Sequence, residues 1–141
     1  MKKLKSFDLV FKFNKDEIGY RQYRTYLQAL QYKRLIYLVE KYTDEHTEIL
    51  DWGGGAGHVS AMLALLKRNV TLFSIVNKKV YWETLTKHFN INFLHDPTAV
   101  RELNIKQDYF SSIISCGVLE HVRETGGDEI VSLKNLTRSL K

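Results

Sequence analysis

Hydrophobic positions along the chain change their period several times, and each change marks the boundary of a predicted element. Residues 20–42 contain no Gly or Pro, and apolar side chains recur through their second half at helical spacing: Leu27, Leu30, Leu35, Leu38 and Val39. This pattern predicts one or two helices, followed by a polar break at residues 43–47.

Short apolar runs alternate with further helical patterns beyond this break. Strands are predicted at 49–50, 70–76, 91–95 and 109–116, because these runs are short and rich in β-branched and aromatic residues. Helices are predicted after Gly57, at 79–89 and after Asp128, where the apolar residues recur at helical spacing and Asp128 is a candidate N-cap. The alternation predicts an α/β fold in which a parallel sheet has helices on both faces and binds ligands at the carboxyl ends of its strands.

Length and composition limit the class of protein. The chain has 141 residues, of which 44% are hydrophobic, and this is enough for one ordinary core. We expect an N-terminal helical segment at 1–46, acting as a lid or cap, and a core at 47–141. Charged residues interrupt the N-terminal apolar run, and no window is long enough to span a membrane, so we expect a cytoplasmic protein.

Ligands for a metal ion are sparse in the sequence. Cys116 is the only cysteine, and the five histidines lack the close spacing of a metal site. We therefore expect no disulfide within the chain and no metal. We expect Cys116 to be a small core residue.

The net charge of +5 raises the possibility of nucleic-acid binding. Tyrosines and basic residues are mixed between residues 20 and 42, and such a mixture can stack bases. The basic residues are scattered rather than clustered along the chain, however. An amphipathic helical segment with packed tyrosines is therefore the favoured interpretation, and nucleic-acid binding is the weaker alternative.

The stretch "ILDWGGGAGHVS", residues 49–60, carries the most specific chemistry. Glycines between the end of a strand and the start of a helix let a ligand lie against bare backbone. The stretch lacks the Gly-Lys-Ser/Thr of a phosphate-binding P-loop. It also fails the dinucleotide pattern G-x-G-x-x-G, because the sixth position falls on His58, Val59 or Ser60 in the three possible registers.

The spacing that remains is an acid followed by alternate glycines: Asp51, Gly53, Gly55 and Gly57. It resembles the first motif of the class I S-adenosylmethionine-dependent methyltransferases. Three later stretches resemble the same family in the same order: "NFLHDP" with Asp96, "DYFSSIISCGVLEHV" and the terminal "LTRSLK". Together these stretches cover residues 47–141, which is far more specific than one glycine loop.

The resemblance implies a Rossmann-like fold, S-adenosylmethionine as cofactor and a small molecule as methyl acceptor. The residues that it places at the cofactor are Asp51, Trp52, Gly53, Gly54, Gly55, Gly57, Asn77, Asp96 and Cys116. His121 and Glu120 are the implied catalytic residues, and Tyr20 and Tyr26 are further possible contacts from the lid. Packing roles remain open for Trp52, His121 and both tyrosines.

Two departures from the family pattern stand out. The acid that usually ends the second strand and binds the cofactor's ribose is replaced by Asn77 or, as a second choice, by Ser74. The chain also stops where a fifth of the family's seven strands should begin. We therefore expect strands in the order three, two, one, four, with an open edge on strand four. The chain then pairs with another chain, dimerises through that edge or folds poorly. The alternative function is a catalytically inactive, truncated domain that binds cofactor or a partner without turnover.

Overall fold

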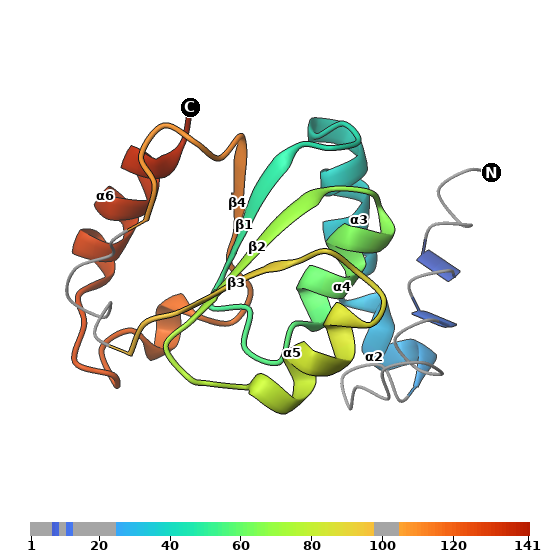
Figure 1. Ribbon diagram of the computed structural model, residues 1–141, viewed down its shortest axis with the longest axis horizontal. Coiled ribbons are helices and arrows are strands. Elements are labelled where there is room, and N and C mark those ends of the chain that lie inside the picture. Colours follow the sequence, from blue (N-terminus) through green and yellow to red (C-terminus); the bar gives the residue numbers. More distant parts are fainter. Residues whose placement is uncertain (1–6, 9–10, 13–24, 98–104) are drawn as a thin grey trace.

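A four-stranded parallel sheet forms the centre of the computed structural model, which describes residues 7–8, 11–12, 25–97 and 105–141 (Figure 1). The strands are β1 (Glu48–Trp52), β2 (Asn69–Ser74), β3 (Asn92–His95) and β4 (Ser112–Ile114). They lie in the order β3-β2-β1-β4, and each neighbouring pair is parallel. Both the predicted parallel sheet and the predicted strand order are confirmed.

Helices cover both faces of this sheet, as predicted. In Figure 1, α6 (Glu129–Ser139) lies on one side, and the other side carries α2 (Tyr26–Leu30), α3 (Lys33–Tyr42), α4 (His58–Leu65) and α5 (Lys79–Thr86). A short 3-10 helix, η3 (Leu119–His121), follows β4. The described part of the segment predicted as one or two helices, residues 25–42, contains two, separated by a turn at Gln31 and Tyr32.

The alternating direction of side chains along β1 explains why there are two hydrophobic cores, one on each face of the sheet. Ile49 packs into the cluster that contains residues of α2 to α5, whereas Leu50 and Trp52 pack into a second cluster with Leu136 of α6. All three β1 side chains are buried, because successive side chains of a strand point to opposite faces and both faces are covered here.

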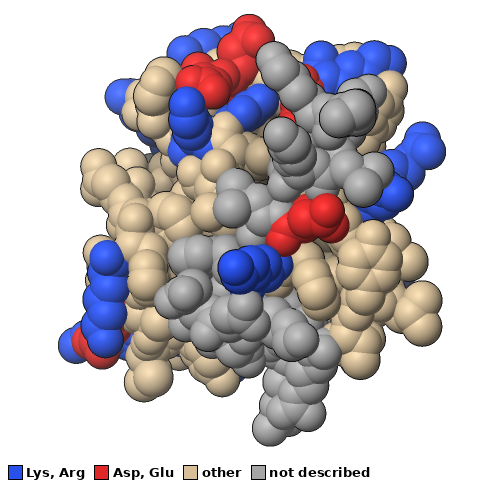
Figure 2. All heavy atoms as spheres, turned by 90° about the vertical axis from the view of Figure 1, so that its right-hand side faces the viewer, with Lys and Arg blue, Asp and Glu red and all other residues tan. Residues whose placement is uncertain are grey.

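The N-terminal helices pack on α4 through an amphipathic face. Ile36 and Val39 of α3 are buried, and the Arg68 guanidinium donates hydrogen bonds to the carbonyl oxygens of Leu66 and Thr43, which tie the end of α3 to the turn after α4. Figure 2 views this side of the molecule and shows basic and acidic side chains interspersed over the described part of the face. This arrangement agrees with the favoured interpretation of residues 20–42 as amphipathic helix.

Tyr20 and Tyr26 are the two tyrosines that the resemblance offered as contacts from the lid. Tyr20 lies outside the described residues. Tyr26 is partly exposed, and its ring makes an edge-on contact with the buried ring of Phe7, with 5.5 Å between the centroids. Tyr26 therefore has a packing role in this structure.

Asp128 caps α6, as its position predicted. Its Oδ1 accepts hydrogen bonds from the backbone N–H groups of Ile130 (2.8 Å) and Val131 (2.9 Å). The inward face of α6 is more polar than its leucines suggest, because Ser132, Leu136 and Ser139 are the buried residues. The large apolar side chains at 130 and 133 remain exposed instead.

Strand lengths differ from the predictions at the carboxyl end of the sheet. β2 ends at Ser74 rather than at Val76, and β4 ends at Ile114 rather than at Cys116. Because Cys116 lies beyond the strand, its side chain is exposed, and the prediction of a small core residue was wrong.

β4 lies at one end of the sheet order, and the last residues of the chain run beside the segment that precedes it. The Phe110 N–H donates to the Ser139 carbonyl (2.9 Å), and the Lys141 N–H donates to the Phe110 carbonyl (3.0 Å). Phe110 and Leu140 thereby form an isolated parallel bridge. The residues of β4 itself, 112–114, pair with β1 alone among the described strands.

Candidate functional site

The glycine loop connects β1 to α4 and is held at both ends. The N–H groups of Gly53 and Gly54 both donate to the Phe73 carbonyl at the end of β2 (2.9 and 3.0 Å). Gly57 is the N-cap of α4 with φ 91°, and Gly53 and Gly55 also have positive φ (76° and 53°). Three of the glycines therefore supply a left-handed conformation that other residues adopt at a cost.

Gly54 has a different reason to be glycine. A Cβ built on it would lie 2.6 Å from Asp51 Oδ2 and 2.8 Å from Leu72 Cγ. Both neighbours are buried, so the loop passes directly over the sheet with no space for a side chain. The close approach holds the loop in one position relative to β1 and β2.

Asp51, in β1, lies directly beside the loop. Its side chain is buried, and Oδ2 accepts a 2.6 Å hydrogen bond from the Ser60 hydroxyl in α4. Burial raises the pKa of the Asp51 carboxyl to about 6, because the interior disfavours the charged form. Asp51 does not line the pocket beside the loop, so it positions the loop.

Trp82 of α5 fastens the middle of the loop. Its Nε1–H donates a 2.8 Å hydrogen bond to the Gly55 carbonyl, and its ring stacks on Phe93 with the centroids 5.3 Å apart. The sequence placed Trp82 on the inward face of a helix, but it gave no sign that the indole N–H reaches the loop.

A second contact joins the lid to the start of α4. The Tyr32 hydroxyl and His58 Nε2 lie 2.9 Å apart, and burial lowers the pKa of His58 to about 4. His58 is therefore neutral at physiological pH. Sequence reasoning missed this pair, because the two residues are 26 positions apart and Tyr32 lies outside every motif that the sequence offers.

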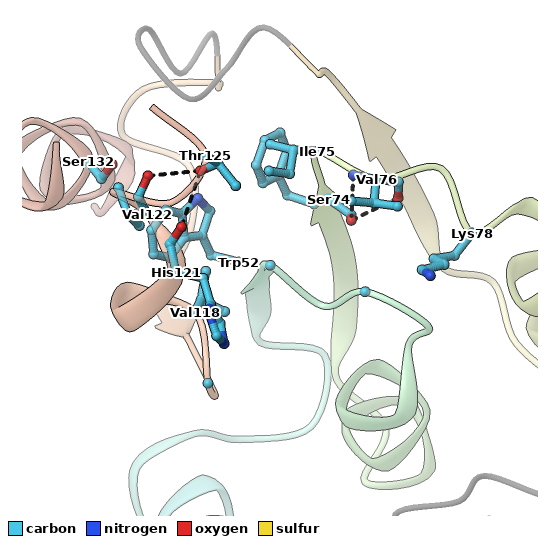
Figure 3. Close-up of a pocket in the computed structure, with 14 residues that line it drawn as sticks. Trp52, Ser74, Ile75, Val76, Lys78, Val118, His121, Val122, Thr125 and Ser132 are labelled. Carbon is cyan, nitrogen blue, oxygen red and sulfur yellow. Dashed lines mark hydrogen bonds between the residues drawn. The ribbon is translucent and has the colours of Figure 1, made fainter. Parts of the chain in front are cut away.

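A pocket of about 270 Å³ opens beside the loop (Figure 3). It lies between the carboxyl ends of β1 and β2, the segment 117–125 and the first turns of α6. Its lining residues are Trp52, Gly53, Gly55, Phe73, Ser74, Ile75, Val76, Lys78, Gly117, Val118, His121, Val122, Thr125 and Ser132. The location at the carboxyl edge of the sheet is the one that the α/β pattern predicted.

The structure brings some of the sequence-predicted residues to this pocket. Trp52, Gly53, Gly55 and His121 line it. Ser74, the second choice for the ribose contact, lines it as well.

Other predicted residues lie away from the pocket lining. The Asn77 side chain accepts a 2.9 Å hydrogen bond from the Lys79 N–H at the start of α5. Asp96 follows β3, and its N–H donates to the Ser74 carbonyl (3.4 Å). Cys116 and Glu120 are exposed beside lining residues.

His121 sits at the rim with a carboxylate partner that sequence reasoning missed. Its Nδ1 lies 2.8 Å from Glu124 Oε2, and its side chain is 60% exposed. The hydrogen bond to Glu124, together with the carboxylate's charge, raises the pKa of His121. The spacing of three residues between His121, at the end of η3, and Glu124 was the signal that would have identified this pair.

The pocket walls contain further residues that the sequence did not single out. Phe73, Ile75, Val118 and Val122 contribute apolar side chains to the lining, and Thr125 and Ser132 contribute hydroxyl groups. The segment 117–125 carries no sustained period, so its side-chain directions were not predictable from the sequence.

The described residues form neither a metal centre nor a membrane-spanning helix. Within the described ranges, no group of three or more His, Cys, Asp or Glu side chains could hold a metal ion. In the same part of the chain, every helix is too short or too polar to cross a bilayer.

Comparison with known proteins shows similarity of fold only. Neither a family model nor a curated protein matches the sequence. Three of the solved structures that match come from prokaryotes. The PH0226 protein from Pyrococcus horikoshii OT3 is 21% identical, with a TM-score of 0.64, over 96% of this chain and 57% of that one.

The other two carry functional names. A putative S-adenosyl-L-methionine-dependent methyltransferase from Methanococcus maripaludis is 16% identical, with a TM-score of 0.62, over 97% of this chain and 58% of that one. A SAM-dependent methyltransferase from Geobacter sulfurreducens, in complex with S-adenosyl-L-homocysteine, is 18% identical, with a TM-score of 0.55, over 77% and 42%. The chain thus spans about half the length of these structures. The predicted Rossmann-like fold is confirmed.

Proposed function

We propose that this chain, which has the fold of S-adenosylmethionine-dependent methyltransferases, binds S-adenosylmethionine against the loop 53–57 and transfers its methyl group to a small molecule. The observation that carries the proposal is the bare backbone at Gly55. A Cβ there would meet nothing closer than the Gly53 carbonyl oxygen at 3.8 Å, and the residue lines the pocket. A loop with bare backbone at the pocket, held in place by Asp51 and Trp82, suits a ligand that packs on main chain.

The residues present fit this cofactor. Bound S-adenosylmethionine supplies an electrophilic methyl carbon on its sulfonium. Gly55 leaves open space beside the pocket for its methionine portion. The chain's own task is then to hold the acceptor in line with the methyl carbon, and positioning alone contributes about 7 to 11 kcal/mol in favourable cases.

His121 and Glu120 remain the proposed proton acceptors. A base is needed only when the acceptor atom carries a proton to lose. In neutral His121 the contact of Nδ1 with Glu124 favours the tautomer that leaves Nε2 free to accept that proton. The pH profile of methyl transfer by a His121→Gln variant tests this role, since an unchanged profile would remove His121 from the chemistry.

Binding of S-adenosylmethionine or S-adenosylhomocysteine by calorimetry tests the central proposal. A Gly55→Arg variant should lose about 100-fold in affinity, equivalent to about 2.7 kcal/mol, because the long side chain enters the pocket. Gly126→Arg is the matched control: Gly126 also has positive φ (83°) and open space, but it does not line the pocket. Its affinity should stay within about threefold of wild type.

Two results would contradict the proposal. Absence of cofactor binding by the wild-type chain would overturn it directly. Equal loss in Gly55→Arg and Gly126→Arg would mean that strain in the backbone, rather than occupation of the pocket, accounts for the effect.

Ser74 is the proposed ribose contact, because it lines the pocket and Asn77 does not. A carboxylate accepts stronger hydrogen bonds than a neutral group, so Ser74→Asp should raise cofactor affinity about tenfold. Asn77→Asp should leave the affinity unchanged, and calorimetry on the pair checks both. A gain in Asn77→Asp alone would place the ribose at Asn77, as the sequence predicted.

Association through the edge of β4 also stays a proposal. The edge residues 112–114 have main-chain groups on one side without a described strand beside them. Unpaired strand edges associate readily, so a second copy or a partner chain suits this position. Sedimentation of the wild-type chain as a monomer at all concentrations would contradict it.

A further inference from the structure

The inner part of the pocket, behind the glycine loop, is almost entirely apolar. Phe73 and Ile75 from the end of β2 face Val118 and Val122 from the segment after β4. Figure 3 shows Ile75 on one side of the pocket and Val118 and Val122 on the other, with the Trp52 side chain extending from the end of β1 toward Val122. We call the space between these side chains the inner recess.

Charged groups in the pocket lie away from the inner recess. In the described part of the chain, the ionisable side chains that line the pocket are Lys78 and His121, and both are exposed. No carboxylate lines the pocket there, because Asp51 is turned toward Ser60. A charged molecule in the inner recess would lose its hydration without gaining a counter-ion, which is costly. The recess therefore selects uncharged ligands.

Trp52 offers one polar group to such a ligand. Its side chain is 5% exposed, and its Nε1 is buried without a hydrogen-bond partner among the described residues. Buried donors are nearly always paired, so an orphaned indole N–H beside a pocket needs an explanation. The other tryptophan of the chain is paired in the usual way, through the Gly55 carbonyl.

The neighbouring hydroxyl groups of Thr125 and Ser74 already have hydrogen-bond partners within the protein. The Thr125 hydroxyl donates to the Val122 carbonyl (2.8 Å), and the Ser74 hydroxyl donates to the Val76 carbonyl (2.9 Å). Both hydroxyl protons are thus committed within the protein. A ligand atom with a lone pair, rather than a donor, is the partner that the Trp52 N–H lacks.

We propose that the inner recess binds the methyl acceptor, and that the acceptor is an uncharged, largely apolar molecule with an oxygen or nitrogen atom that accepts a hydrogen bond from Trp52 Nε1. The inference rests on the proposed function, since it divides one pocket between a cofactor at the loop and an acceptor behind it. Trp52 is then a specificity-determining residue for the acceptor.

Nuclear magnetic resonance of the ¹⁵N-labelled full chain tests this proposal with quinoline as the probe. Quinoline is flat, neutral near neutral pH, and carries one accepting nitrogen. The chain has two tryptophans and hence two indole N–H signals, which a Trp52→Phe variant assigns. We expect quinoline to move the Trp52 signal downfield and to leave the Trp82 signal in place. An unmoved Trp52 signal at saturating quinoline, or no binding, would overturn the proposal.

Naphthalene is the matched probe, because it has the shape of quinoline without the accepting atom. Wild type should bind quinoline about fivefold more tightly than naphthalene, the effect of one net hydrogen bond. Trp52→Phe keeps an aromatic side chain and should bind both equally. Equal binding by wild type would overturn the proposal, and that result needs no folded variant.

Saturating S-adenosylhomocysteine separates this proposal from the proposed function. If the acceptor occupies the inner recess, quinoline still moves the Trp52 signal in the presence of S-adenosylhomocysteine. If S-adenosylhomocysteine moves that signal itself and excludes quinoline, the N–H serves the cofactor and the proposal fails. Failure of S-adenosylhomocysteine to bind at all would overturn the proposed function, whatever quinoline does.

Discussion

Asp51→Asn is expected to lose about 2 kcal/mol more of its free energy of unfolding than wild type when the pH falls from 7.5 to 4.5. The cause is a pair of groups, the buried Asp51 and the partly buried His58, whose pKa shifts have opposite effects on stability. Asp51 lies in β1 just before the loop, and His58 is the first residue of α4 just after it.

His58 makes the folded state sensitive to acid. Burial lowers its pKa from 6.5 to about 4, so between these values the unfolded chain binds a proton that the folded chain does not. Stability is therefore lost as the pH falls through this window, by about 2 to 3 kcal/mol at pH 4.5.

Asp51 has the opposite effect. Burial raises its pKa from 3.8 to about 6, so between these values the folded chain binds a proton that the unfolded chain does not. Stability is gained as the pH falls through this window, by about 2 kcal/mol at pH 4.5. In wild type the gain largely cancels the loss at His58, and Asp51→Asn exposes that loss.

Urea unfolding at both pH values measures these differences, with His58→Gln as the reciprocal variant. Glutamine accepts a hydrogen bond from Tyr32 but does not titrate, so His58→Gln should gain stability on acidification relative to wild type. Other titrating groups are common to all three proteins and cancel in the comparison. Parallel pH dependence in all three would show that neither group is buried as described.

Gly54→Ala is expected to lower the free energy of unfolding by about 2 to 3 kcal/mol. The new Cβ would overlap Asp51 Oδ2 and Leu72 Cγ, and neither can withdraw, because both belong to buried residues of the sheet. Gly55→Ala is the matched control in the same loop: it has positive φ but open space, so only strain of about 1 kcal/mol is expected.

Urea unfolding of both variants near neutral pH checks this order. A Gly54→Ala protein that is no less stable than Gly55→Ala would show that the loop does not approach the sheet as closely as the structure has it. The comparison is informative because both changes add the same single methyl group.

Local sequence patterns were sufficient to predict the strands, their order in the sheet and the glycine loop. Period and glycine placement are properties of short segments, and the parallel order followed from the resemblance that those segments carry. Contacts between distant segments were not predictable in this way. The bond from Trp82 to Gly55, the pair of Tyr32 and His58, and the side of the pocket formed by Val122 depend on how elements pack.

The ribose contact shows why the boundaries of elements matter. The sequence extended the second strand to Val76, which put Asn77 at its end. The strand stops at Ser74, and Asn77 instead accepts a hydrogen bond from the Lys79 N–H as α5 begins. Asparagine is favoured before a helix for this reason, so the same side chain fitted two local roles and the sequence could not separate them.

The pairing of β4 has a kinetic consequence. β1 meets β2 over five residue pairs, and the chain between them is short. β1 meets β4 over three pairs, after some sixty intervening residues, as the register of Ile49 with Ser112 shows. Loop closure makes such distant pairing the slower step, so the glycine loop can assemble before the opposite pocket wall. Release of β4 and α6 as a subglobular unit would then open the pocket while the loop stays formed.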